Sequence, residues 1–168
     1  MTRASPQVAT LDPDAFAALL GRGERLIGID VGTDTLGLAL SDVERMVATG
    51  LMTIRRTRFG RDADALLALV AEHRVGGLVI GLPIHLDGGE GPRAQATRAF
   101  ARNLAQRTPL PMLLWDERMT TVAAERALLE ADTSRKRRAA LIDQVAATLI
   151  LQTALDRMRP RPAAVPAD

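Results

Sequence analysis

The chain has 168 residues and a mass of 18.1 kDa, which fits one domain better than two. Its 47% apolar and 25% charged residues argue against wholesale disorder, and the absence of cysteine excludes disulfides, thiolate metal sites and a thiol nucleophile. The formal net charge is only +2, so the pI of about 10.2 reflects scarce titrating groups rather than a large basic surplus. No apolar run reaches the roughly 20 residues that cross a bilayer, so we expect a cytoplasmic protein with no membrane partner.

The start of the chain predicts one short helix. Asp12 followed by Pro13 is typical of a helix start, and Phe16 and Leu19 would give the helix an apolar stripe. The last ten residues contain three prolines, which favour disorder. We therefore expect three parts: an N-terminal extension at 1–24, a folded domain at 25–158 and a disordered tail at 159–168.

The middle of the chain predicts a sheet with helices. Apolar runs bounded by turn residues predict strands at 26–31, 36–40, 47–54, 78–80 and 112–115. Apolar residues at helical spacing predict helices at 62–73, 92–106, 121–131 and 140–158. The first three strands follow one another through short turns, whereas the later strands alternate with helices. This order predicts an α/β fold in which helices flank a five-stranded mixed sheet.

Three carboxylates lie where an apolar environment makes charge costly. Asp30 interrupts the first strand, Glu117 follows the last strand, and Asp143 lies in the final helix. On a helical projection of about 100° per residue, Asp143 falls at the margin of an apolar face that includes Leu141 and Leu149. Because ligands gather at the carboxyl ends of parallel strands, we expect the three acids to converge there.

Such a carboxylate cluster predicts a divalent-metal site. Neighbouring carboxylates repel one another unless a cation neutralises them, and oxygen-only ligands suit Mg²⁺ or Mn²⁺. Two such ions can activate water and stabilise the leaving oxygen of a phosphodiester. Each acid also has a plainer interpretation: Asp30 as a turn cap, Glu117 as an ion-pair partner of Arg118, and Asp143 as a solvated helix acid.

Four motifs follow in a fixed order along the chain. They are LIGIDVGT at 26–33 with GLALSD at 37–42, IGLP at 80–83 with EGPRA at 90–94, WDER at 115–118 with TT at 120–121, and IDQVAA at 142–147 with ILQ at 150–152. This order resembles the YqgF/RuvX-type nucleases, small bacterial proteins of the RNase H-like, Holliday-junction-resolvase superfamily. The resemblance covers about residues 26–156.

The resemblance implies an RNase H-like fold in which Asp30, Glu117 and Asp143 are the metal-binding catalytic acids. It further implies a nuclease that matures the 5′ end of the small-subunit (16S) rRNA precursor, with in-line attack by water leaving a 5′-phosphate and a 3′-hydroxyl. Some family members resolve branched DNA junctions, which would need a homodimer or paired copies. The alternatives are a non-catalytic RNA- or ribosome-binding factor and a nucleotide-phosphate binder.

Basic residues near these motifs are candidate nucleic-acid contacts. Arg93 begins the helix at 92–106 and could bind phosphate or pair with Glu90, and Arg118 could assist at the acids. A basic run in the predicted loop before the last helix could hold a nucleic-acid backbone or be solvated; it comprises Arg135, Lys136, Arg137 and Arg138. A second cluster, with the same two interpretations, comprises Arg55, Arg56, Arg58 and Arg61.

Other residues narrow the mode of recognition. The chain has only three phenylalanines and one tryptophan, so we expect recognition by shape and phosphates rather than by base stacking. Asp34 stands where many members of the resembled family carry a basic residue, which weakens the case for a phosphate contact in that turn. Gly32 and Gly37 could permit the hairpin or let a phosphate approach the backbone.

Overall fold

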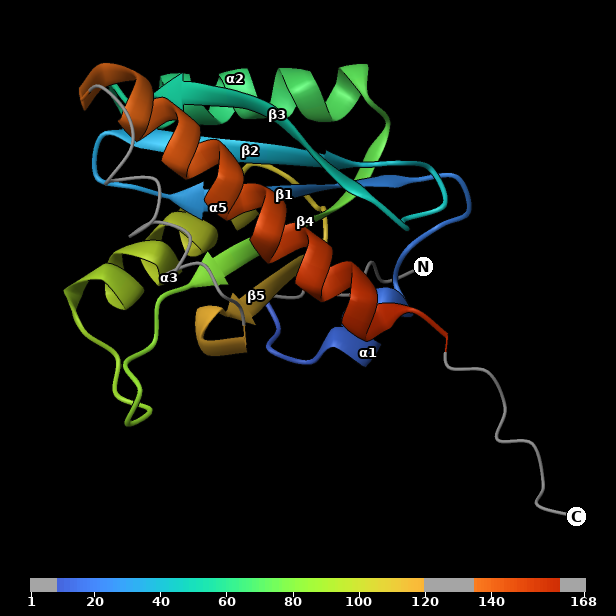
Figure 1. Cartoon of the computed structure of the whole chain (residues 1–168). Coiled ribbons are helices and arrows are strands. Elements are labelled where there is room, and N and C mark those ends of the chain that lie inside the picture. Colours follow the sequence, from blue (N-terminus) through green and yellow to red (C-terminus); the bar gives the residue numbers. More distant parts are fainter. Residues whose placement is uncertain (1–8, 120–134, 161–168) are drawn as a thin grey trace, which may run out of the picture.

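A computed structural model describes residues 9–119 and 135–160 of the chain, without the side chains of 135–140. The elements in chain order are α1 (Pro13–Ala17), β1 (Arg25–Val31), β2 (Thr35–Ser41), β3 (Ala48–Arg55), α2 (Phe59–Glu72), β4 (Val75–Leu82), α3 (Pro92–Ala105), β5 (Met112–Asp116), the 3-10 turn η1 (Glu117–Met119) and α5 (Arg135–Met158). Figure 1 shows α5 crossing one face of the sheet, with α2 and α3 behind the other. The helix predicted at 121–131 lies outside the described residues.

The five strands form one mixed sheet in the order β3-β2-β1-β4-β5. β1, β2 and β3 are antiparallel neighbours, whereas β4 runs parallel to β1 and β5 runs parallel to β4. This arrangement confirms the predicted mixed sheet and the antiparallel opening. The carboxyl ends of β1, β4 and β5 consequently lie at one end of the sheet, where ligands of such sheets gather.

Strand alternation divides the core into two layers. In β1, Ile27 and Ile29 are fully buried against α2 and α3, whereas Leu26 faces α5. Because side chains alternate along a strand, Gly28 and Asp30 share the α5 face with Leu26. The α5 face of β1 therefore presents an apolar residue, a glycine and then an acid.

The buried face of α5 combines isoleucine and leucine with three alanines. Its buried residues are Ile142, Ala146, Ala147, Ile150, Leu151, Ala154 and Leu155. At about 100° per residue, Asp143 falls between Ile150 and Ala154, in the middle of this face. The expected position at the margin is therefore wrong, because Leu141, which defined the predicted face, is 43% exposed.

Glycines let α5 approach the sheet this closely. A Cβ added to Gly28 would lie 2.7 Å from Leu151 Cβ and 2.9 Å from the Ala147 carbonyl oxygen. A Cβ on Gly37 would overlap the backbone carbonyl of Asp143. The structure thus shows that Gly37 makes room for the helix backbone, a third role besides the two that the sequence left open for it.

The N-terminal segment packs against the edge strand and the α5 layer. Thr10 forms a parallel bridge with Leu113, and Phe16 of α1 is fully buried. Asp12 caps α1 by accepting a hydrogen bond from the Asp14 amide at 3.0 Å, as predicted. The predicted apolar stripe is narrower than expected, since Leu19 is 50% exposed.

The basic run at 135–138 is helical, which corrects the expected loop. α5 begins at Arg135, so these residues form its first turn. Arginine and lysine are good helix formers, so a run of them can continue a helix that apolar periodicity alone would start later. Within the described part of the chain, no helix combines the length and apolarity that a membrane crossing requires.

Candidate active site

Asp30 lies at the centre of the candidate site. It is only 1% exposed and is paired with Gly37 on the neighbouring strand β2. On the other side, the parallel register pairs Ile29 with Ile80, which places Gly81 of β4 beside Asp30. Paired residues of neighbouring strands share a face of the sheet. The Asp30 side chain therefore lies on the α5 face between two glycines.

Asp143 of α5 lies on the β2 side of Asp30. Its backbone carbonyl is directly above Gly37, and its Oδ2 is 3.8 Å from the position of a Cβ on Gly32. The Thr35 hydroxyl donates a hydrogen bond to the same Oδ2. The Asp143 carboxylate is therefore held above the turn that joins β1 to β2. Thr35 was not among the residues predicted from the sequence, although its place directly after this turn offered a signal.

Glu117 lies on the β4 side of Asp30. It follows β5 directly in the 3-10 turn η1 and is half-buried. A Cβ on Gly81 would lie 2.7 Å from Glu117 Oε1, so the carboxylate is placed over that glycine. Asp30 thus has Asp143 above one flanking glycine and Glu117 above the other. The structure brings the three predicted acids to the same face and the same end of the sheet.

The acids are arranged around Asp30 without forming a compact cluster. Among residues 9–119 and 135–160, no three acidic or histidine side chains are close enough to hold a metal ion as they stand. All three predicted ligands supply only oxygen, the donor type that Mg²⁺ and Mn²⁺ prefer. The chemistry of the donor set therefore fits a divalent cation, which would draw the carboxylates together.

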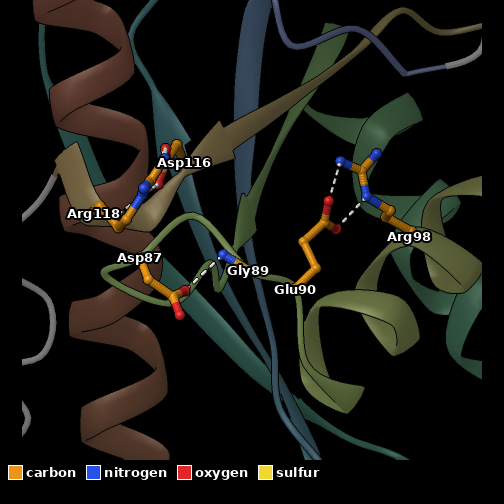
Figure 2. A network of polar contacts seen from close by, with 6 residues as sticks. All are labelled: Asp87, Gly89, Glu90, Arg98, Asp116 and Arg118. Carbon is orange, nitrogen blue, oxygen red and sulfur yellow. Dashed lines mark hydrogen bonds and ion pairs between the residues drawn. The ribbon is translucent and has the colours of Figure 1, made fainter.

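Arg118 is engaged by Asp116 at the end of β5. Its Nη2 donates to Asp116 Oδ2 at 2.7 Å and its Nε donates to Oδ1 at 3.1 Å. These hydrogen bonds lower the pKa of the Asp116 carboxyl. Figure 2 shows this pair beside the loop that bears Asp87 and Gly89. The guanidinium expected to assist at the acids therefore has Asp116, and not Glu117, as its ion-pair partner.

Arg93 is exposed at the start of α3 and has no ion-pair partner among the described residues. The alternative that it pairs with Glu90 is wrong. Glu90 instead accepts hydrogen bonds from Arg98 Nε and Nη2 at 2.5 and 3.0 Å (Figure 2), which lowers the pKa of Glu90. Arg98 therefore anchors this loop, a role that was not predicted from the sequence, and Arg93 is left open to solvent.

The basic run of α5 lies at the helix end nearest Asp143. Arg135 precedes Asp143 by eight residues, about 12 Å along a helix axis. Figure 1 shows the first turns of α5 at the end of the sheet where β3 leads into α2. The backbone therefore places Arg135, Lys136, Arg137 and Arg138 on the approach to the acids, and their side chains lie outside the description.

Comparisons with known proteins found a matching family model and similar relatives. The family model described as "RuvX: Holliday junction resolvase" matches residues 24–157. A Rhodobacter capsulatus protein is 61% identical over 86% of this chain and 91% of its own length, and a Paracoccus denitrificans protein is 62% identical over 87% and 92%. Both are named "Putative pre-16S rRNA nuclease".

A solved structure supports the fold. The chain is similar to T. thermophilus RuvC in complex with a Holliday junction substrate, with a TM-score of 0.50 and 15% identity, over 80% of this chain and 96% of that chain. At this identity the likeness shows the shared fold alone, and it agrees with the predicted RNase H-like sheet.

Proposed function

The chain belongs to the RuvX family, and on that premise we propose that it is a metal-dependent endonuclease that processes the 5′ end of the 16S rRNA precursor in the cytoplasm. The observation that carries the proposal is the place of Asp30, a buried acid flanked by Gly37 and Gly81 at the carboxyl end of β1. Relatives at about 60% identity carry the corresponding name, which supports the RNA substrate.

Asp30, Glu117 and Asp143 would hold Mg²⁺ or Mn²⁺, with two ions as the expected number. Bound ions of this kind activate a water molecule and stabilise the leaving oxygen of a phosphodiester. The protein itself contributes by holding the three carboxylates in position. Strand β1 fixes Asp30, the Thr35 hydroxyl orients the Asp143 carboxylate, and Gly81 leaves space for Glu117. Such preorganised ligands reduce the rearrangement needed when the substrate binds.

Arginines would bind the substrate phosphates next to these acids. Arg93 is exposed and available for a phosphate at the start of α3. Arg118 can exchange part of its bidentate contact with Asp116 for a phosphate, since its side chain is 34% exposed. The basic run at Arg135–138 would hold the backbone farther from the scissile bond.

The test is cleavage by the wild type and by Asp30→Asn, with Mg²⁺ or Mn²⁺ and with EDTA. We expect the wild type to cut a precursor of 16S rRNA only with the metal, and Asp30→Asn to lose the activity at least about 1,000-fold. The control is Asp64→Asn on α2, behind the opposite face of the sheet, whose carboxylate pairs with Arg107 and with no residue of the site that the structure describes. Equal activity of the wild type and Asp30→Asn would show a contaminating nuclease and refute the assignment.

A branched DNA junction is the second candidate substrate, favoured by the description of the family model. Cutting both strands of a junction requires two active sites, hence a homodimer or paired copies. A four-way DNA junction belongs in the same cleavage test, with the oligomeric state measured by sedimentation. Cleavage of the junction but not of the RNA would refute the proposal that rRNA is the substrate, while the assignment as a phosphodiester hydrolase would stand. Metal-independent RNA binding without cleavage would instead indicate a non-catalytic ribosome factor.

A further inference from the structure

A cluster of exposed arginines occupies the corner between β3 and α2. Arg55 ends β3, Arg58 precedes α2 and Arg61 lies in its first turn; all three are exposed. None of the three forms an ion pair with another residue that the structure describes. We call these three residues the arginine corner. Three guanidinium groups within seven residues make a local positive surface despite the small net charge of the chain.

Arg56, in the same stretch, is bound by other residues of the protein. Its Nη1 donates a hydrogen bond to the Gly32 carbonyl at 2.7 Å. Its Nε lies 4.0 Å from Asp62 Oδ2, and its guanidinium lies 5.9 Å from the centre of the Phe100 ring. Its amide also donates to the Asp34 carbonyl at 2.8 Å. Arg56 therefore fixes the arginine corner to the turn between β1 and β2.

This attachment brings the arginine corner next to the candidate active site. Arg55 is the register partner of Thr35, so both residues are on the α5 face of neighbouring strands. Paired residues of antiparallel strands have Cα atoms about 5 Å apart. Thr35 in turn donates its hydroxyl hydrogen to Asp143. The path from Asp143 to the corner therefore crosses only one pair of strands.

The charge of this path is positive. Asp34, exposed in the turn beside the corner, offsets one of the three arginines and leaves a local charge of +2. Free guanidinium groups are the groups best suited to bind phosphate oxygens, because they donate two parallel hydrogen bonds. A phosphate chain that enters the acid site across the turn would meet these arginines next.

We propose, resting on the proposed function, that the arginine corner binds backbone phosphates of the substrate nucleic acid outside the cleavage site. Arg55 binds the phosphate nearest the acids, and Arg58 and Arg61 bind phosphates farther along the strand. The corner thereby extends the contact beyond the scissile bond and favours substrates that continue past the end of β3 toward the start of α2. Its ligand is the sugar–phosphate backbone, in RNA or in DNA.

The experiment compares two triple variants in the Asp30→Asn background, which keeps the substrate intact. The first changes Arg55, Arg58 and Arg61 to Gln. The control changes Arg22, Arg74 and Arg102 to Gln; these are exposed arginines placed before β1, before β4 and late in α3. Both variants lose the same charge. Binding of a labelled precursor RNA and of a DNA junction is measured from low to moderate salt.

We expect the corner variant to bind about tenfold more weakly or worse, and to reduce the slope of log affinity against log salt by about 2 to 3. The control should change that slope by less than about 1. A third variant, Asp34→Asn, should tighten binding, because it removes the negative charge on the path. A weakened RNA arm with an unchanged DNA arm, or the reverse, identifies which nucleic acid occupies the corner.

Equal slopes for the two triple variants, at equal thermal unfolding midpoints, would overturn the proposal. If the corner variant does not fold, the Asp34→Asn variant decides. Unchanged nucleic-acid binding by Asp34→Asn would contradict the proposal that the substrate passes this turn to reach the arginine corner. These binding results do not depend on cleavage. If the wild type cuts no substrate but the two triple variants still differ in slope, the proposed nuclease activity is refuted, whereas the proposed binding of phosphates by the arginine corner stands.

Discussion

Thr35 donates its hydroxyl hydrogen to Asp143 Oδ2, although 108 residues separate the two in the chain. The hydrogen bond joins the start of β2 to the buried face of α5, and it orients a half-buried carboxylate. Thr35 is thus a positioning residue for one of the three proposed metal ligands. A substitution at Thr35 therefore tests how much the orientation of the Asp143 carboxylate matters, because it leaves Asp143 itself in the chain.

Thr35→Val should impair the site without unfolding the protein. Valine keeps the branched shape that suits a strand but lacks the hydroxyl donor. Groups that orient metal ligands are typically worth about 10- to 100-fold in metal affinity or activity. We expect a loss of this size, together with a rise in the metal concentration that gives half-maximal cleavage. Thr35→Ser, which keeps the donor, should stay near the wild type, and equal losses in both variants would contradict the positioning role.

Gly37→Ala should destabilise the fold. The added Cβ would overlap the Asp143 carbonyl, so α5 must move away from β2. Overpacking of this kind costs about 1–3 kcal/mol in the free energy of unfolding. The matched control is Gly60→Ala in α2, where the nearest atom is Arg107 Nη2 at 3.7 Å; we expect no loss there, since alanine is the better helix former. Urea unfolding of both variants checks the prediction, and comparable stabilities would refute it.

Asp42 should make stability depend on pH in the acidic range. Its Oδ1 accepts hydrogen bonds from the amides of Val47 and Met46 at 3.0 and 2.7 Å, and these bonds, led by that from Val47, lower the pKa of Asp42. A lowered pKa means that the charged form stabilises the fold fully above the unfolded pKa of about 3.9. This stabilisation is lost as the pH falls through the pKa of the folded state.

Asp42→Ala should therefore lower the free energy of unfolding by about 1–2 kcal/mol at pH 7. The gap between this variant and the wild type should narrow below about pH 4, as the wild-type carboxylate becomes protonated. Urea unfolding at pH 7 and pH 3 measures both gaps. A gap that stays constant between these two values of pH would contradict the role of the charged form.

Arg98→Met should release the loop between β4 and α3. Glu90 is held to α3 only through the Arg98 guanidinium among the described residues. An exposed ion pair contributes at most about 1 kcal/mol to global stability, so the main effect should be local. We expect faster amide exchange at Gly88 and Gly89 with little change in the unfolding midpoint. Arg93→Met, the matched control on the same helix, should leave this exchange unchanged and weaken nucleic-acid binding.

The central strands were predictable because apolar runs dominate them. Leu78, Val79 and Ile80 are fully buried in β4, as a continuous apolar run in a central parallel strand suggests. The helix α5 was predicted less well, since the projection gave most weight to its leucines. Leu141 is 43% exposed, whereas Ala147 is fully buried, because Ala147 lies where α5 crosses Gly28 and its carbonyl oxygen comes close to that glycine.

The contacts within the site could be predicted only in part. The positions of Asp30 and Glu117 at strand ends follow from local pattern, and their convergence follows from sheet topology. The partners of Arg98 and Arg118 depend on side-chain conformations and loop shape, which no spacing in the sequence encodes. For the same reason the pairing of Glu90 with Arg93 was a wrong alternative, although both lie in one motif.

The close packing of α5 on Gly28 and Gly37 also determines which substitutions could change the geometry of the site. At Gly37 the main chain of the helix lies directly against the main chain of the sheet, and at Gly28 the Ala147 carbonyl oxygen and Leu151 Cβ come almost as close. The separation of Asp143 from Asp30 is then governed by the thickness of two backbones, a quantity that core substitutions elsewhere leave unchanged. Substitutions elsewhere in the core of this protein can therefore change its packing while the spacing of the two acids stays the same.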